Sequence, residues 1–338
     1  MAHPSFGLSS QLANLLFGEP SLSPTKSSMA FADTAMAAEL LEPSLVHLEA
    51  SDDANLTSPR MFLFHDGTGA IDHLRNLEGF LGFPCTIIPL TSRAPLDSLK
   101  AMADHYVSAI LAYQPTGPYV LAGYSFGART AFQAAKLLEA KGHVVQGLLC
   151  IDDPPFYDPA YTQASRRDIC RAAACLAFAV DGSEGQAAVD LLLANKATPD
   201  ALCQLVKDAA SPKALSPLLQ GVATMDPSIR LATTQAFVTG TCRIVVMMAN
   251  AAFLKDADAT PAKAHGALLR VAEAKRQQFR AHIPLTLQAS PDDYGMGGYV
   301  RNVELPIRAL DESHEALFSI RSIVKTAKAM NELYSTFL

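Results

Sequence analysis

Residues 119–128 constrain the fold of this chain more than any other segment, and they read Tyr-Val-Leu-Ala-Gly-Tyr-Ser-Phe-Gly-Ala. A short apolar strand passes into a Gly-x-Ser-x-Gly pattern, and a helix-forming run follows at once. A serine on so sharp a strand-to-helix turn has a strained backbone, so the residues two positions away must be almost free of side chain. Gly123 and Gly127 meet that requirement. The segment therefore predicts a nucleophile elbow with Ser125 at its tip.

The chain around this elbow alternates short apolar runs with amphipathic stretches. We expect strands at 61–64, 86–89 and 147–151, and helices at 96–111 and 128–141. Such alternation with short loops is typical of a parallel sheet covered by helices on both faces. The sequence therefore predicts an α/β fold of the α/β-hydrolase type, with a doubly wound, mostly parallel sheet.

Two segments depart from this alternation. Residues 1–59 are rich in serine, proline and alanine and predict a flexible leader or linker. From about 156 to 280 strands are absent, and alanine-rich helical segments such as 166–180 and 262–280 predict a helical lid inserted into the domain. Two strands then return, at 284–289 and 303–309. We therefore expect one α/β-hydrolase domain over 60–338, with the lid inserted in it.

Composition excludes several classes of protein. Hydrophobic side chains make up 49% of the 338 residues and charged ones 18%, which suits a large buried core. The net charge of −6 argues against a nucleic-acid partner, because no basic stripe is present to neutralise phosphates. No apolar run approaches the ~20 residues that span a bilayer. The six cysteines are scattered without a Cys-x-x-Cys pair, so we expect reduced thiols and a cytoplasmic location.

A reactive serine needs a base within hydrogen-bond reach and a carboxylate that orients this base. In α/β-hydrolases these groups follow the serine in the order acid, histidine, from loops at the carboxyl ends of strands. Asp152 and Asp153 both end the strand after Ser125, and strand alternation decides only weakly between them. Of nine histidines, His314 follows the last predicted strand, where chain order requires the base.

The developing oxyanion also needs hydrogen-bond donors. We expect one to be the backbone N–H of Phe126, at the positive end of the helix that follows the serine. The second should come from the loop 65–69, His-Asp-Gly-Thr-Gly, with the N–H of Gly67 as first choice and that of Asp66 as second. We interpret His65 in the same loop as a structural residue.

Four stretches of the chain carry a family resemblance, at 94–99, 114–119, 122–128 and 160–163. In the same order they resemble the terminal thioesterase domain of animal-type fatty acid synthases and of related polyketide and nonribosomal peptide synthases. The resemblance runs from about residue 60 to the C-terminus. It implies that Ser125 is the nucleophile, Asp152 the acid and His314 the base.

Two positions depart from the family pattern. The family usually has a glycine two residues before the histidine, and Glu312 stands there, so its carboxylate could raise the pKa of His314. Asp66 stands where the family often has proline or glycine. A carboxylate beside an oxyanion site is unfavourable, so we expect the Asp66 side chain to point outward.

The resemblance implies hydrolysis of an acyl thioester carried on the phosphopantetheine of an acyl carrier protein, or of acyl-CoA, with release of a fatty acid or polyketide. The enzyme itself would need no cofactor and no metal, and it could form part of a multidomain synthase or work with one. The cations Arg270, Lys275, Arg276 and Arg280 along one predicted helix could dock an acidic carrier protein, or form an ordinary solvated face.

Three alternatives remain open. A cyclase that releases a polyketide would use the same three catalytic residues. A lipase or carboxylesterase would act on oxygen esters instead of thioesters. A binding protein built on a hydrolase scaffold would lack catalysis, although all three catalytic residue types are present.

Overall fold

The computed structural model describes residues 45–156, 164–179, 181–209, 212–216, 219, 230–250, 254, 257–272, 293–302 and 304–338, although for 230–236 it describes the backbone alone. The sequence-based predictions for 1–44, 160–163 and the strand at 284–289 lie outside these residues. No helix in the described part of the chain has both the length and the apolar character needed to cross a membrane.

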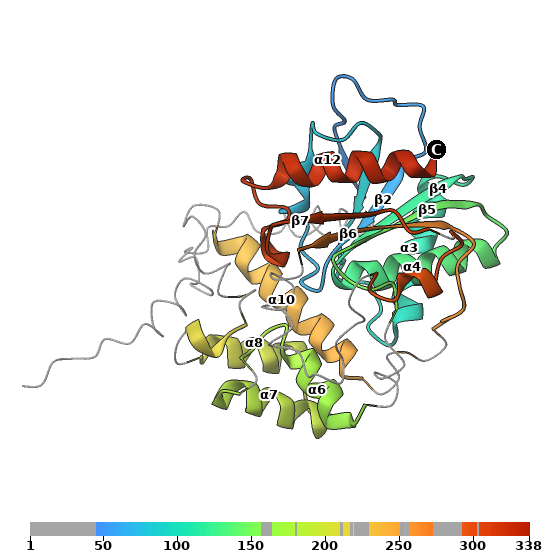
Figure 1. The fold of residues 1–338 in the computed structure, drawn as a ribbon. Coiled ribbons are helices and arrows are strands. Elements are labelled where there is room, and N and C mark those ends of the chain that lie inside the picture. The colour runs from blue at the N-terminus through green and yellow to red at the C-terminus, as the bar shows by residue number, and fades with distance from the viewer. Residues whose placement is uncertain are drawn as a thin grey trace, which may run out of the picture.

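A seven-stranded sheet forms the centre of the molecule (Figure 1). Its strands lie in the order β1-β3-β2-β4-β5-β6-β7, and every neighbouring pair is parallel except β1 with β3. The strands are β1 (Val46–Leu48), β2 (Met61–Phe64), β3 (Cys85–Ile88), β4 (Tyr119–Tyr124), β5 (Val145–Ile151), β6 (His265–Val271) and β7 (Ile307–Leu310). This topology confirms the predicted α/β-hydrolase fold.

Helices cover both faces of the sheet (Figure 1). On one face lie α3 (Leu99–Tyr113) and α4 (Phe126–Ala140), and on the other lies α12 (Ile323–Tyr334). The side chains of each central strand alternate between the two cores, as the period of two along a strand requires. In β2, for example, Phe62 and Phe64 join the α3–α4 core while Met61 and Leu63 join the α12 core.

A separate group of helices, all between β5 and β6 in the chain, lies beside the sheet (Figure 1). It comprises α6 (Arg166–Ala174), α7 (Ser183–Leu193), α8 (Pro199–Lys207) and α10 (Arg230–Met248). Short 3₁₀ turns complete the described elements, namely η1 (Leu74–Leu77), η2 (Pro212–Ala214), η4 (Met296–Gly298), η5 (His314–Ala316) and η6 (Ser335–Phe337).

The predicted helix over 262–280 is wrong where the structure describes it, because 265–271 form β6 between β5 and β7. Alanine and leucine favour a helix there by intrinsic propensity, but burial in the middle of a sheet overrides that preference. Gly266 allows this packing, since a Cβ atom at that position would lie 2.7 Å from the Val300 side chain. The helical insertion therefore ends before β6, earlier than the predicted residue 280.

The predicted leader also contributes to the sheet. Val46–Leu48 form β1 and pair antiparallel with β3, in the register Val46 opposite Ile87. A side-chain contact supports this pairing, because His47 Nδ1 lies 2.8 Å from the Thr86 hydroxyl. The sheet therefore includes residues that precede the predicted boundary at residue 60.

All six cysteines are free thiols, and five of them are buried. This confirms the prediction of reduced, buried cysteines. The cytoplasmic location inferred from them stays a prediction.

Candidate active site

Ser125 lies at a sharp turn between β4 and α4, and its φ of 53° and ψ of −129° fall outside the regions that most residues occupy. The flanking glycines are required by close contacts. A Cβ on Gly123 would lie 2.0 Å from the carbonyl oxygen of Gly127, and a Cβ on Gly127 would lie 2.3 Å from that of His65. The serine N–H donates to the carbonyl of Ile151, at the end of β5. These contacts give the physical reason for the Gly-x-Ser-x-Gly pattern.

Asp152 and His314 form a buried pair, although 162 residues separate them. The distance from His314 Nδ1 to Asp152 Oδ2 is 2.7 Å, and both side chains are almost fully buried. Asp152 follows the last residue of β5 and His314 follows β7, which places both at the carboxyl ends of parallel strands. Ser125 follows β4, so the three predicted catalytic residues lie along one edge of the sheet.

The adjacent Asp153 has a different partner. Its carboxylate pairs with both terminal nitrogens of the Arg129 guanidinium, one of them at 2.9 Å. Burial raises the pKa of Asp153, and the charge of Arg129 opposes that rise. Of the two aspartates that the sequence left open, Asp152 is the one that contacts the histidine.

The second oxygen of the Asp152 carboxylate is also bonded. Oδ1 accepts hydrogen bonds from the backbone N–H of Val271 at 3.0 Å and from the hydroxyl of Tyr294 at 2.6 Å. The sequence analysis missed Tyr294. Its segment carries only turn-forming signals, such as the glycines that follow it, and no local pattern connects it with Asp152.

Tyr124, the residue before Ser125, also contacts His314. Its hydroxyl donates to the backbone carbonyl of His314 at 2.6 Å, and the two rings stack with their centres 4.9 Å apart. His73 lies against the same tyrosine ring, with a separation of 5.7 Å between centres. The histidine is thus held by its backbone, its ring face and its Nδ1 atom.

Burial disfavours the charged form of His314, but the hydrogen bond and the charge of Asp152 outweigh this effect and raise the pKa of the imidazole above its ordinary value. Glu315 and Asp153 add to the rise. Glu312, the carboxylate that the sequence analysis considered for this role, accepts a hydrogen bond of 2.7 Å from Lys325 on α12. A raised pKa suits a base that must hold a proton briefly and then return it.

The two predicted oxyanion donors belong to residues that lie side by side. A Cβ atom on Gly67 would lie 3.6 Å from the Cβ atom of Phe126. Leu176, just after α6, also lies close to this glycine, with its Cδ1 3.5 Å from the same Cβ position. The loop after β2 and the start of α4 therefore meet under the helical insertion.

Asp66 is buried, with 5% of its surface exposed, so the prediction that it points outward is wrong. Its Oδ1 accepts hydrogen bonds from the backbone N–H of Thr68 at 2.8 Å and from the Thr68 hydroxyl at 2.5 Å. Its Oδ2 lies 3.5 Å from His73 Nε2. The Asp66 carboxylate thus stabilises the turn of its own loop by accepting hydrogen bonds from the residue two positions later, as aspartates often do in tight turns.

His65 fastens this loop to α3. Its Nδ1 lies 2.6 Å from the carbonyl oxygen of Asp66, and its Nε2 lies 2.7 Å from the hydroxyl of Tyr106. Burial lowers the pKa of His65 to about 4, so the ring is neutral near pH 7. These contacts agree with the interpretation of His65 as a structural residue.

Helix α10 packs directly on the same loop. A Cβ atom on Gly240 would lie 2.0 Å from the carbonyl oxygen of Thr68, so only glycine lets the helix approach this closely. Three residues later, Arg243 donates to the carbonyl oxygens of Thr91 at 2.8 Å, Ser92 at 3.1 Å and Ala94 at 3.2 Å. The only sign of this role of Arg243 in the sequence is that a charged residue stands within an apolar helical run.

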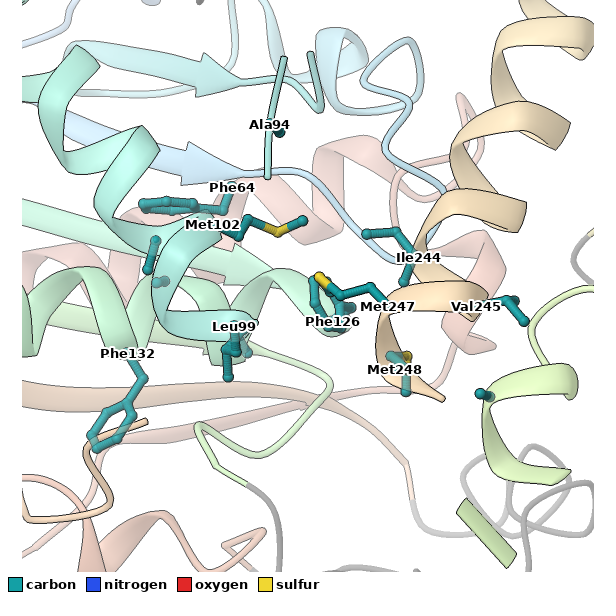
Figure 2. Close-up of a cluster of buried hydrophobic side chains, with 14 of the residues drawn as sticks. Phe64, Ala94, Leu99, Met102, Phe126, Phe132, Ile244, Val245, Met247 and Met248 are labelled. Atoms are coloured by element: carbon teal, nitrogen blue, oxygen red, sulfur yellow. The ribbon is translucent and has the colours of Figure 1, made fainter. Parts of the chain in front are cut away.

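The apolar side of α10 continues this interface around Phe126, the residue after Ser125. Figure 2 shows Met247 and Ile244 of α10 beside Phe126, with Met102 and Leu99 of α3 nearby. All five side chains are buried. Helix α10 is therefore fixed to the sheet domain by apolar packing and hydrogen bonds.

The fold and the serine elbow define an α/β-hydrolase. A family model described as "Thioesterase domain" matches residues 59–210. The matching relatives are segments of large synthases, among them orsellinic acid synthase of Beauveria bassiana, 38% identical over 104 residues that make up 28% of this chain and 5% of the relative. Polyketide synthase PksR of Bacillus subtilis is 30% identical over 112 residues, or 32% of this chain and 4% of the relative. Residues 59–210 thus match the thioesterase domain family, and parts of the chain are similar to segments of large synthases.

Solved structures agree in fold. The thioesterase domain of Vlm2, bound with a dodecadepsipeptide, has a TM-score of 0.55 at 14% identity, covering 85% of this chain and 96% of that one. The four-domain nonribosomal peptide synthetase AB3403 has a TM-score of 0.52 at 17% identity, covering 89% of this chain and 21% of that one. The family resemblance is confirmed at the level of polyketide and peptide synthases. The finer likeness to animal fatty acid synthases stays a prediction.

Proposed function

We propose that this domain is a serine thioesterase that releases an acyl product from the phosphopantetheine thioester of a carrier protein. Ser125 is the nucleophile, His314 the general base and Asp152 the group that orients the imidazole. The observation that supports this proposal most is the buried contact of 2.7 Å between His314 Nδ1 and Asp152 Oδ2. Because Nδ1 is engaged by Asp152, Nε2 is the ring nitrogen that can take a proton from Ser125 and return it.

The reaction runs in two halves. Ser125 Oγ attacks the thioester carbonyl while its proton passes to His314 Nε2. The backbone N–H groups of Phe126 and Gly67 would stabilise the oxyanion, and its collapse expels the carrier thiol, which takes the proton from His314. Water then attacks the acyl-serine with His314 as base again, and the proton returns to Ser125. The product is a free carboxylic acid.

The acyl chain would lie near Gly67, Phe126 and Leu176, where the oxyanion loop, α4 and the helical insertion meet. We propose that α6, α7 and α8 form the movable part of the lid, because α10 is fixed to the sheet domain through Gly240 and Arg243. A movable lid would admit the pantetheine arm and then exclude water from the thioester.

The structure does not place the four predicted docking cations on one helix. Arg270 lies on β6, within the sheet, whereas Lys275, Arg276 and Arg280 lie outside the described residues. The carrier protein is therefore proposed as the partner from the family alone, without an assigned surface. The chain spans about a twentieth of the length of the synthases reported above, so work within a multidomain synthase is likewise a proposal.

The test is a panel of acyl thioesters of N-acetylcysteamine and of a carrier protein, with products identified by mass spectrometry. We expect a free acid from the parent protein and none from Ser125→Ala. Ser108→Ala is the matched control, because Ser108 is an exposed helical serine that bonds only within α3 in the described contacts. Turnover by Ser125→Ala at the parent rate would refute the proposal.

The same panel separates the alternatives. A cyclic product, lighter than the corresponding free acid by one water, would identify a cyclase that uses the same residues. Cleavage of oxygen esters without cleavage of thioesters would identify an esterase. If a fluorophosphonate probe fails to label Ser125, the domain is a binding protein on a hydrolase scaffold.

A further inference from the structure

The Asp152 carboxylate is held by more than its histidine. Oδ2 contacts His314, while Oδ1 accepts two hydrogen bonds, from the N–H of Val271 and from the hydroxyl of Tyr294. Val271 is the last residue of β6, so its N–H is fixed by the sheet. The Tyr294 hydroxyl comes from outside the sheet, and its contact of 2.6 Å is the shorter of the two on Oδ1.

The backbone that presents Tyr294 is unusual. Its φ is 56°, a left-handed conformation that aromatic residues rarely adopt, and Gly295 follows with a φ of 72°. Asp293 fixes this turn, because its carboxylate accepts hydrogen bonds from the N–H groups of Gly295 at 2.8 Å and Gly297 at 3.0 Å. The turn rests on β6, where Gly266 leaves room for the Met296 side chain.

This turn directs the buried Tyr294 hydroxyl at a single atom, Oδ1 of Asp152. Tyr294 is 5% exposed, and its hydroxyl bonds the carboxylate oxygen that does not face the histidine. Burial and the negative charge of Asp152 raise the pKa of Tyr294, so the hydroxyl keeps its proton and acts as a donor. A strained turn that delivers a donor to a carboxylate at the active site is a recognised way of fixing its orientation.

We propose that Tyr294 is a positioning residue for the thioesterase reaction, which fixes the Asp152 carboxylate and moderates how strongly it attracts the proton on His314. This inference rests on the proposed function. A donor on Oδ1 withdraws negative charge from the carboxylate, so His314 releases its proton more readily than it would beside an unmodified Asp152.

The charged and titratable groups around this pair come from several elements. Those that act on His314 or lie against its neighbours are Asp152, Asp153, Glu315, Tyr124 and His73, and those that act on Tyr294 are Asp152, Asp153 and Arg270. The substitution Tyr294→Phe alters none of these other groups chemically. The change in the behaviour of His314 can therefore be assigned to that hydroxyl.

The test compares pH–rate profiles of Tyr294→Phe and the parent on an acyl thioester. Without the donor, Asp152 holds the imidazolium more strongly, so the acid limb of kcat/KM should move to higher pH by about half a unit. The loss of orientation should lower the plateau of kcat about tenfold, with KM nearly unchanged. A purely structural tyrosine would alter thermal stability without moving the acid limb.

Tyr119→Phe is the matched control. It removes a tyrosine hydroxyl whose hydrogen bond, to the carbonyl of Gln114, is 2.7 Å long, at the opposite end of β4 from Ser125. We expect its acid limb to coincide with that of the parent. Equal shifts in Tyr119→Phe and Tyr294→Phe would overturn the inference.

A second variant keeps the inference testable if Tyr294→Phe fails to fold. Incorporation of 3-fluorotyrosine at position 294 retains the hydroxyl and makes it a stronger donor, so the acid limb should move to lower pH. A shift to higher pH, or none, would contradict the inference. If the parent protein itself has no thioesterase activity, the proposed function is wrong. If the parent is active and Ser125→Ala is inactive, the proposed function stands, and the pH–rate profiles test Tyr294 alone.

Discussion

The neutral, buried His65 should make the stability of this domain depend on pH in a predictable way. Burial lowers the pKa of His65 to about 4, whereas in the unfolded chain it has the ordinary value of 6.5. Between these two values the unfolded chain binds a proton that the folded protein does not. Stability from this residue is therefore fully present above pH 6.5 and is lost as the pH falls toward 4.

The magnitude follows from the two pKa values. Each unit of difference corresponds to about 1.4 kcal/mol, so lowering the pH from 7.5 to 5 should reduce the free energy of unfolding by about 2 kcal/mol through His65 alone. Replacement of His65 by glutamine removes the titrating group and keeps both a donor and an acceptor. The variant should be less stable than the parent at pH 7.5, but the difference should shrink by about 2 kcal/mol at pH 5.

The assay is guanidinium chloride unfolding at the two pH values, followed by circular dichroism. Other titrating histidines affect parent and variant alike, so the difference between them isolates His65. Tyr106→Phe is the control, because it removes the hydroxyl that contacts Nε2 but leaves the buried ring in place. Its stability should fall by a similar amount at both pH values. Parallel pH dependence in the parent and His65→Gln would refute the reasoning.

Two further predictions concern the site itself. Asp152→Asn should lower kcat by about 10³-fold or more, because the wrong tautomer of the histidine is then favoured, whereas Asp153→Asn should stay within about tenfold of the parent; equal losses in thioesterase assays would contradict this assignment. Gly240→Ala should lower kcat about a hundredfold, since its Cβ would lie 2.0 Å from the carbonyl of Thr68 and displace the loop that carries the proposed oxyanion donor Gly67. Gly82→Ala, whose nearest neighbour would be 3.7 Å away, is its control, and similar rates for the two variants would count against the role of α10.

The elbow could be predicted from the sequence because its causes are local. The strand, the turn and the helix follow one another within 119–140, and the close contacts that require Gly123 and Gly127 arise from the turn itself and from the adjacent end of β2. His314 could be placed by chain order, since it is the histidine that follows the last predicted strand.

What the sequence missed depends on contacts between distant segments. The residues of β6 have helical propensity, and only pairing with β5 and β7 makes them a strand. Asp152 and Asp153 are adjacent in the sequence, and only the folded chain shows that Asp152 contacts His314 while Asp153 pairs with Arg129 on α4. Tyr294 lies 142 residues from the carboxylate that it contacts, and no periodic pattern records such a contact.

A covalent intermediate on one serine tests the account most directly. The protein is mixed with an acyl thioester, quenched with acid within milliseconds to seconds, and analysed by intact-mass and peptide mass spectrometry. The account predicts one acyl group per chain, attached to Ser125, that decays as free acid appears and is absent in Ser125→Ala. Release of product with no acyl group on Ser125 at any time, or with the acyl group on another residue, would contradict it.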